Sequence, residues 1–176
     1  MSESKESHLR VLTEIIVFVA LSSVLYFIRF YVLPLGGSIT AGSMVPIFWL
    51  SFRRGSRVGI EAGFLLGLIV MTIEPFLFHP VQVILDYLIP FAALGLAGLC
   101  KKQPLIGVAL GMTLRFISHF LSGIIFADIF IFPYYPEANP IVFSALYNGS
   151  YIVPELIVSM VIIYILTKTK TLKIYL

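Results

Sequence analysis

The chain has 176 residues, 59% of them hydrophobic and 12% charged, with a formal net charge of +3 and a mean hydropathy of +1.01. Soluble domains carry about 25% charged residues, so this composition excludes an ordinary soluble domain and indicates an integral membrane protein. The length suits a single transmembrane domain over residues 1–176, with no room for a separate soluble catalytic domain.

Six apolar segments follow one another and predict an all-α bundle of six transmembrane helices. The predicted helices cover about residues 11–32, 40–52, 58–73, 81–100, 105–127 and 141–166. The second and third are short for a membrane span, which needs about 20 residues, so we expect them to be tilted or shielded by neighbours. The first is too long for a signal-peptide core, and we expect it to be retained as a span.

Basic residues gather on one side of this arrangement. They flank the whole bundle and occupy the second-to-third and fourth-to-fifth connections: Lys5, Arg10, Arg53, Arg54, Arg57, Lys101, Lys102, Lys168, Lys170 and Lys173. The opposite loops, residues 33–42, 74–80 and 128–140, contain neither lysine nor arginine. The positive-inside rule therefore predicts a multi-pass protein of the cell membrane with both termini cytoplasmic. The loop over residues 128–140 is rich in proline and tyrosine. It could equally well cover a site or form part of an interfacial aromatic belt.

Polar side chains recur at helical spacing inside three of the apolar segments. Arg115 and His119 lie one turn apart in the fifth predicted helix, and Gln82 and Asp86 do so in the fourth, followed by Tyr87. The sixth helix carries a polar stripe made of Ser144, Asn148, Tyr151 and Glu155. An ionisable group at bilayer depth costs about 3 kcal/mol or more, so these faces should avoid lipid. We expect them to converge on one polar pocket toward the outer side.

Structural roles compete with this interpretation. Arg115 is equally well suited to pair with Asp86 or Glu155 and lock the bundle. Asn148 also fits a role in hydrogen bonding between helices, and Gly149 predicts a close helix contact.

Several motifs are absent from the sequence. It has no Walker A sequence, no glycine-rich phosphate loop, no paired-histidine metal motif and one cysteine, Cys100. Ser150 and His119 lack the context of a hydrolase. The sequence therefore predicts no metal, no cofactor, no enzymatic activity and no use of ATP by this chain alone. A membrane enzyme built on Arg115, His119 and Asp86, or a solitary channel-like carrier, stays open as an alternative.

Five segments, in order over nearly the whole chain, carry a family resemblance. They are residues 34–40 (PLGGSIT), 51–55 (SFRRG), 79–87 (HPVQVILDY), 115–123 (RFISHFLSG) and 147–151 (YNGSY). With them the sequence resembles the thiamine-specific substrate-binding (S) components of energy-coupling factor (ECF) ABC transporters, the ThiT or YuaJ family. The resemblance implies a six-helix S-component fold with a thiamine site near the outer face.

The resemblance also assigns roles to single residues. The family's acidic–tyrosine pair corresponds to Asp86 and Tyr87, its histidine to His119 with the basic residue one turn earlier at Arg115, and its asparagine to Asn148. In the family the acidic residue and the asparagine are expected to hold the aminopyrimidine, while aromatic rings stack on the ligand. The full substrate-binding set that we predict is Gln82, Asp86, Tyr87, Arg115, His119, Phe143, Tyr147, Asn148 and Tyr151.

Two positions depart from the family pattern. Phe143 stands where some relatives have tyrosine, and a phenyl ring can still stack but lacks the hydroxyl. Ala127 stands where some have tryptophan, and Phe132, Tyr134 or Tyr135 are the candidates to replace that ring.

The resemblance implies protein partners as well. An S component presents its vitamin to a transmembrane coupling subunit and two ATP-binding subunits, which supply the energy. The small-xxx-small docking pattern expected on the first helix is only partial, with Ile16 four residues before Ala20. The alternative ligand is another vitamin or a thiamine precursor such as a hydroxymethylpyrimidine.

Overall fold

The computed structural model describes residues 2–169, with side chains from residue 8 onward. In chain order the elements are α1 (Ser2–Phe27), β1 (Arg29–Val32), β2 (Ser38–Thr40), α2 (Val45–Arg54), α3 (Ser56–Ile73), α4 (Pro80–Val83), η1 (Ile84–Leu88), α5 (Ile89–Leu94), η2 (Gly95–Cys100), α6 (Pro104–Ile125), α7 (Ala127–Phe130) and α8 (Pro140–Lys168). Residues Pro80–Cys100 form one continuous rod, which is π-helical over η1 and 3₁₀-helical over η2.

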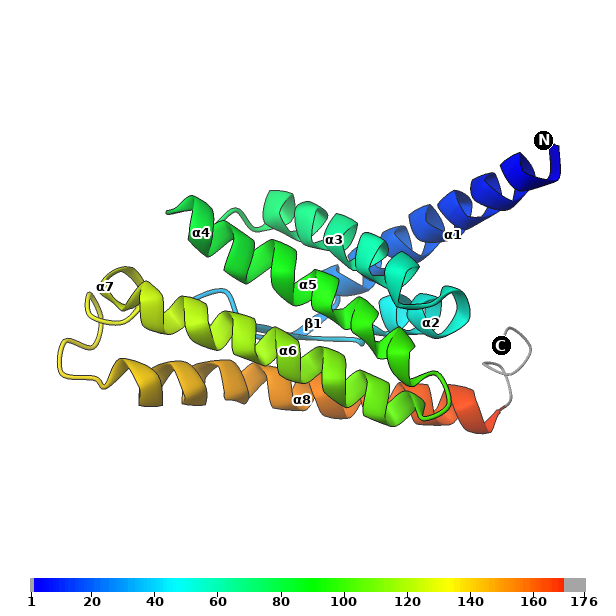
Figure 1. Ribbon diagram of the computed structural model, residues 1–176. Coiled ribbons are helices and arrows are strands. Elements are labelled where there is room, and N and C mark those ends of the chain that lie inside the picture. The colour runs from blue at the N-terminus through cyan, green and yellow to red at the C-terminus, as the bar shows by residue number, and fades with distance from the viewer. Residues whose placement is uncertain (1, 170–176) are drawn as a thin grey trace.

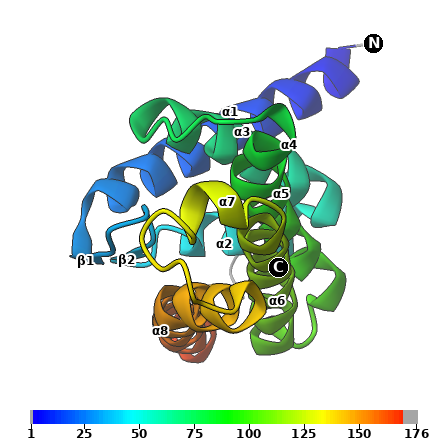
Figure 2. The ribbon, with the colours of Figure 1, turned by 90° about the vertical axis from the view of Figure 1, so that its left-hand side faces the viewer.

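The long helices lie roughly along one direction (Figure 1). Helices α6 and α8 pack against each other, and the rod packs between α6 and α3. The C-terminal half of α1 packs on α2 and α3, whereas its N-terminal half extends away from the bundle. The β1–β2 hairpin sits at one side, where β2 contacts both α1 and α8 (Figure 2). The fold is therefore mostly helical, with one two-stranded sheet at the side of the helical bundle.

Five helical stretches in the described residues are long and apolar enough to cross a membrane. They are His8–Phe27, Ser56–Ile73, Pro80–Cys100, Pro104–Ile125 and Pro140–Lys168. Helix α2 has only ten residues, too few for a span, and most of its side chains are buried in the core. The second predicted helix is thus a short internal helix that begins at Val45, not near Thr40.

The prediction of a helix over residues 11–32 is wrong at its C-terminal end. The prediction of a purely α-helical fold is therefore wrong as well, because this end is a strand. Helix α1 stops at Phe27, and Arg29–Val32 instead pairs antiparallel with Ser38–Thr40. The connecting turn contains Gly36 at φ 91°, a backbone conformation that glycine adopts without strain. Two hydrogen bonds close the hairpin: the Leu33 N–H donates to the Gly37 carbonyl at 2.7 Å, and the Gly36 N–H donates to the Leu33 carbonyl at 3.1 Å.

Glycines on one face of α3 bring two backbones into direct contact. They recur every four residues, at Gly59, Gly63 and Gly67. A Cβ atom on Gly63 would collide with the carbonyl oxygen of Phe91, and one on Gly67 with that of Tyr87. The rod therefore packs on α3 without intervening side chains. The close contact expected at Gly149 is not formed, because a Cβ there would meet nothing within 4 Å.

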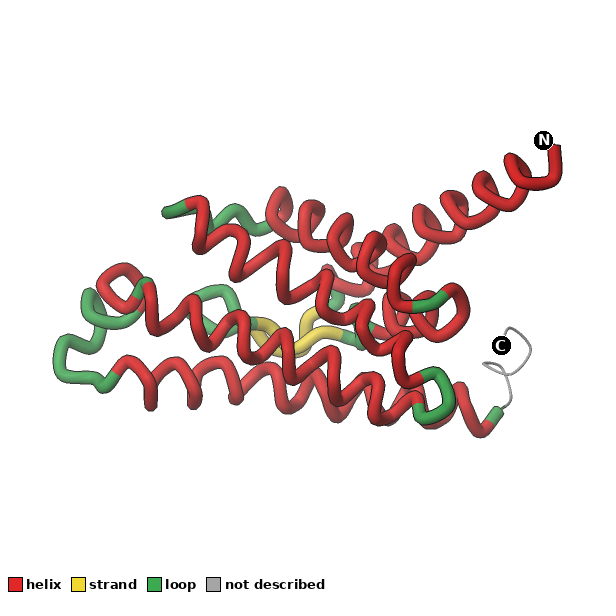
Figure 3. Tube along the Cα trace, viewed as in Figure 1, coloured by secondary structure: helices red, strands yellow, loops and turns green. Residues whose placement is uncertain are grey.

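The connections collect at two opposite ends of the bundle (Figure 3). One end holds the α2–α3 and η2–α6 connections and the end of α8, and we call it the basic end after Arg53, Arg54, Arg57, Lys101, Lys102 and Lys168. The other, which we call the cavity end, holds the hairpin turn, the α3–α4 connection and α7. Lys170, Lys173 and the side chain of Lys5 lie outside the described part of the chain.

Candidate functional site

A cavity of about 400 Å³ opens among the rod, α6, α8 and the loops of the cavity end. This volume lies in the range of about 300–1,000 Å³ that is typical of small-molecule sites. The wall includes all nine residues of the predicted set: Gln82, Asp86, Tyr87, Arg115, His119, Phe143, Tyr147, Asn148 and Tyr151. The structure thus brings the three polar helix faces together, and the role of these residues in binding stays a prediction.

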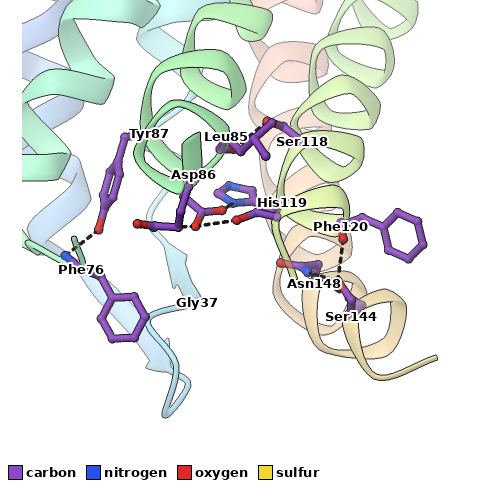
Figure 4. A network of polar contacts seen from close by, with 12 residues as sticks. Gly37, Phe76, Leu85, Asp86, Tyr87, Ser118, His119, Phe120, Ser144 and Asn148 are labelled. Carbon is purple, nitrogen blue, oxygen red and sulfur yellow. Dashed lines mark hydrogen bonds and ion pairs between the residues drawn. The ribbon is translucent and has the colours of Figure 1, made fainter. Parts of the chain in front are cut away.

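Asp86 is the centre of a polar network on one wall (Figure 4). Its Oδ2 accepts hydrogen bonds from Gln82 Nε2 at 2.7 Å and from Ser122 Oγ at 2.9 Å. Its Oδ1 lies 3.2 Å from Nδ1 of His119. Three partners from the rod and α6 therefore fix the orientation of this carboxylate before any ligand is present.

His119 offers its second ring nitrogen to the cavity wall. With Nδ1 donating to the Asp86 carboxylate, a neutral imidazole keeps an acceptor lone pair on Nε2. This Nε2 is buried and has no hydrogen-bond partner within residues 8–169. The imidazole ring also packs edge-on against Tyr151, with ring centroids 6.1 Å apart. The structure therefore leaves one buried ring nitrogen beside the Asp86 network unpaired.

Asn148 is oriented by its own helix. Its Oδ1 accepts from the Tyr151 hydroxyl at 2.8 Å, and its Nδ2 donates to the Ser144 carbonyl at 2.9 Å. The bond between helices is made one turn earlier, where Ser144 Oγ donates to the Phe120 carbonyl on α6 at 2.9 Å. The hydrogen bond between helices that was the structural alternative for Asn148 is therefore made by Ser144 instead.

An aromatic row on α8 forms another part of the wall. Phe143, Tyr147 and Tyr151 follow at intervals of four residues, which places them on one helix face. The rings of Phe143 and Tyr147 stack with centroids 6.1 Å apart, and those of Tyr147 and Tyr151 meet edge-on at 5.9 Å. Ring faces of this kind attract an organic cation.

Arg115 is held by apolar and sulfur contacts rather than by a carboxylate. Its Nη1 donates to Met44 Sδ at 2.9 Å, and its guanidinium carbon lies 4.8 Å from the ring centroid of Phe91. No ion pair joins Arg115 to Asp86 or Glu155 in the residues that the structure describes, so the predicted lock is not observed. Glu155 is fully buried and accepts from the backbone of β2.

Tyr87 has a second function as a loop anchor. Its hydroxyl donates to the Glu74 carbonyl at 2.6 Å and accepts from the Phe76 N–H at 3.0 Å. The Glu74 carboxylate in turn accepts from the Tyr26 hydroxyl at 2.6 Å and forms an ion pair with Arg29. This cluster ties the α3–α4 loop to the end of α1 and to the hairpin.

Several cavity residues come from a loop or from the four-residue helix α7, and they belong to no longer helical pattern that sequence reasoning could use. Phe76 and Phe130 line the cavity and stack with centroids 5.5 Å apart. The aromatic candidates proposed in place of tryptophan at Ala127, namely Phe132, Tyr134 and Tyr135, do not line it. The short helix α7 turns Phe130 inward instead, and its only sequence signal is the aromatic run after Ala127.

The remaining predictions concern docking and metals. Ile16 and Ala20 are exposed on α1, outside the cavity, and their docking role stays a prediction. Within the described chain, no group of three or more His, Cys, Asp or Glu residues is arranged to hold a metal ion.

The chain is similar to known thiamine transporters. The sequence profile of the family Thia_YuaJ, described as thiamine transporter protein, matches residues 12–175. The chain is 33% identical to the thiamine transporter ThiT of Bacillus subtilis (strain 168) over 189 aligned residues, covering 96% of this chain and 95% of that relative. It is 24% identical to ThiT of Lacticaseibacillus paracasei, over 70% of each chain.

A solved structure shares the fold. The structure of ThiT from Listeria monocytogenes superposes with a TM-score of 0.81 at 26% sequence identity, covering 94% of this chain and 97% of that one. The family consists of transporters, which confirms the prediction that the protein is not an enzyme. The family profile, the relatives and the fold all agree, and the chain belongs to the thiamine transporter family Thia_YuaJ.

Proposed function

We propose that this protein is the S component of an ECF-type transporter and that it captures thiamine in the cavity. The observation that carries the proposal is one cavity whose wall contains both a fixed carboxylate and an aromatic row. Thiamine carries both complementary parts, a permanently charged thiazolium and an aminopyrimidine with donors and acceptors. Membership of a thiamine transporter family supports the same ligand.

Each wall has its own part in binding. Asp86 and the amide of Asn148 hold the aminopyrimidine, since the carboxylate and the Asn148 Oδ1 keep acceptor lone pairs, while His119 fixes the orientation of the carboxylate. The rings of Phe143 and Tyr147 face the thiazolium. Arg115 supports the wall, where its Nη1 donates to Met44 and its guanidinium lies over the ring of Phe91.

The charge distribution supports an orientation in the membrane. With the basic end cytoplasmic, both chain termini are cytoplasmic and the cavity end faces outward, where a vitamin arrives. Residues 1–176 then form one multi-pass domain of the cell membrane, in which α2 is a short sixth membrane helix shielded from lipid by its neighbours.

Energy must come from other chains, since this sequence has no ATP-binding motif. We assign that task to a transmembrane coupling subunit and two ATP-binding subunits. The exposed face of α1 around Ile16 and Ala20 is the docking surface that we propose for the coupling subunit.

The thiamine assignment is tested on the purified chain by thermal unfolding with and without thiamine. A ligand that binds only the folded state raises the unfolding temperature, so wild type and the control Glu61→Gln, an exposed pair partner of Arg57, should both shift. Asp86→Asn removes the charge that the network holds and should weaken thiamine binding about 10- to 100-fold. Equal shifts for all three proteins would reject the site.

The alternative ligand is separated by competition. A hydroxymethylpyrimidine can engage Asp86 and Asn148 but has no thiazolium to place against the aromatic row. If the aromatic row contributes as proposed, this precursor binds more weakly than thiamine. Precursor affinity equal to or above that of thiamine, or its recovery as the co-purified ligand by mass spectrometry, would favour the alternative.

A further inference from the structure

The rod changes its helical geometry beside Asp86. Over η1 the backbone is π-helical, and the N–H of Ile89 donates to the carbonyl of Ile84, five residues earlier. The next residue, Pro90, has no N–H to donate. The carbonyl of Leu85 therefore receives neither the α-helical bond, since the N–H of Ile89 donates to Ile84, nor the π-helical bond, since Pro90 has no N–H.

A side chain from the neighbouring helix supplies the missing bond. Ser118 of α6 is almost completely buried, and its Oγ donates to the Leu85 carbonyl at 2.6 Å (Figure 4). A carbonyl that is partly shielded from water costs stability when it has no partner, so this bond favours the observed contact between the rod and α6. It joins the residue directly before Asp86 to the residue directly before His119.

We propose that Ser118 is a positioning residue, which sets the register between the rod and α6 so that Asp86 meets both His119 and Ser122. A slip of one residue along a helix is about 1.5 Å. A shift of that size would break the contacts of 3.2 Å and 2.9 Å that Asp86 makes with α6. Its consequence for thiamine affinity rests on the proposed function.

The experiment compares Ser118→Ala with two other variants. Ser118→Thr keeps the hydroxyl. The control Ser51→Ala removes another buried serine hydroxyl, which donates at 2.6 Å to the Ile47 carbonyl within its own helix. Two quantities are measured, thiamine affinity by calorimetry and the ¹⁵N signals of the histidine side chains. The sequence has three histidines, His8, His79 and His119, so the signals can be assigned by substitution.

Ser118→Ala should bind thiamine about tenfold more weakly, because an orphaned carbonyl lets the rod shift, and it should move the His119 signal. Ser118→Thr and Ser51→Ala should resemble wild type in both measurements. A purely stabilising role would lower the unfolding temperature of Ser118→Ala and leave the His119 signal in place.

A second variant tests the cause. Pro90→Ala restores an N–H that can serve the Leu85 carbonyl, so Ser118→Ala should move the His119 signal less in that background than alone. An unchanged His119 signal in Ser118→Ala overturns the proposal, as does unchanged affinity when wild type binds thiamine. If wild type binds no thiamine, the proposed function fails, and the His119 signal still decides whether Ser118 positions the site.

Discussion

The two halves of the bundle bury different kinds of side chain. Toward the basic end, α2 places Phe48 and Phe52 in a fully buried apolar core, and the ring of Phe52 lies close to Gly107 of α6. Toward the cavity end, the buried groups include Gln82, Asn148 and Arg115, arranged around an open volume of about 400 Å³. One half resembles the interior of a close-packed protein, whereas the other buries polar groups around a cavity.

This contrast indicates that stability and ligand affinity depend on different parts of the molecule. Tight packing without cavities stabilises the fold but leaves no room for a ligand. Oriented polar groups around a cavity bind a ligand but stabilise the fold little. Substitutions in the packed half should therefore change unfolding, and those in the cavity half should change thiamine affinity.

The largest effect on stability is expected from Gly63→Ala. The new methyl group would collide with the backbone carbonyl of Phe91, which cannot move aside as a side chain can. We expect the free energy of unfolding to fall by about 3 kcal/mol, measured by denaturant unfolding in detergent. Gly149→Ala is the matched control, since its methyl group meets nothing within 4 Å. Equal losses in both variants would show that the glycine contact is unimportant.

Tyr151→Phe is expected to have a smaller effect, which falls on thiamine affinity and not on stability. The change removes the hydroxyl that orients Asn148 and leaves the ring in place. Thiamine affinity should fall about tenfold, measured by calorimetry, while the unfolding temperature changes little. Tyr164→Phe, at a half-exposed position on the same helix, should leave both unchanged. Strong destabilisation by Tyr151→Phe would break the division between the two halves.

The smallest effect is expected from Glu14→Gln on α1. Its carboxylate forms ion pairs with Arg54 at 2.7 Å and Arg53 at 3.0 Å. These pairs are partly exposed to solvent, so we expect a loss of about 1 kcal/mol or less. Thermal unfolding at low and high salt should show that salt reduces the difference from wild type. Any loss of thiamine affinity would contradict the separation of the two halves.

The sequence predicts the cavity wall well because polar side chains in membrane helices avoid contact with lipid. Asp86, His119 and Asn148 sit on separate apolar helices, and each would be costly against lipid. Helical spacing therefore identifies the faces that turn inward, and these faces meet in the structure. The same reasoning cannot assign individual partners, as Arg115 shows by contacting Met44 and not a carboxylate.

Other features depend on contacts that spacing does not reveal. Arg29–Val32 continues the apolar run of α1, and only its pairing with residues 38–40 makes it a strand. Phe76 and Phe130 come from loops and short turns without a repeat. The glycine face of α3 did have a readable signal, three glycines four residues apart, whereas the single Gly149 makes no close contact.

Two tyrosine hydroxyls have a consequence for the thermodynamics of uptake. Tyr87 bonds the backbone at Glu74 and Phe76, and Tyr147 accepts from the N–H of Gly37 in the hairpin turn. These segments therefore lose their conformational entropy when the chain folds, and not when the vitamin arrives. Binding would then require no ordering of these two segments, and the association rate would not be limited by it.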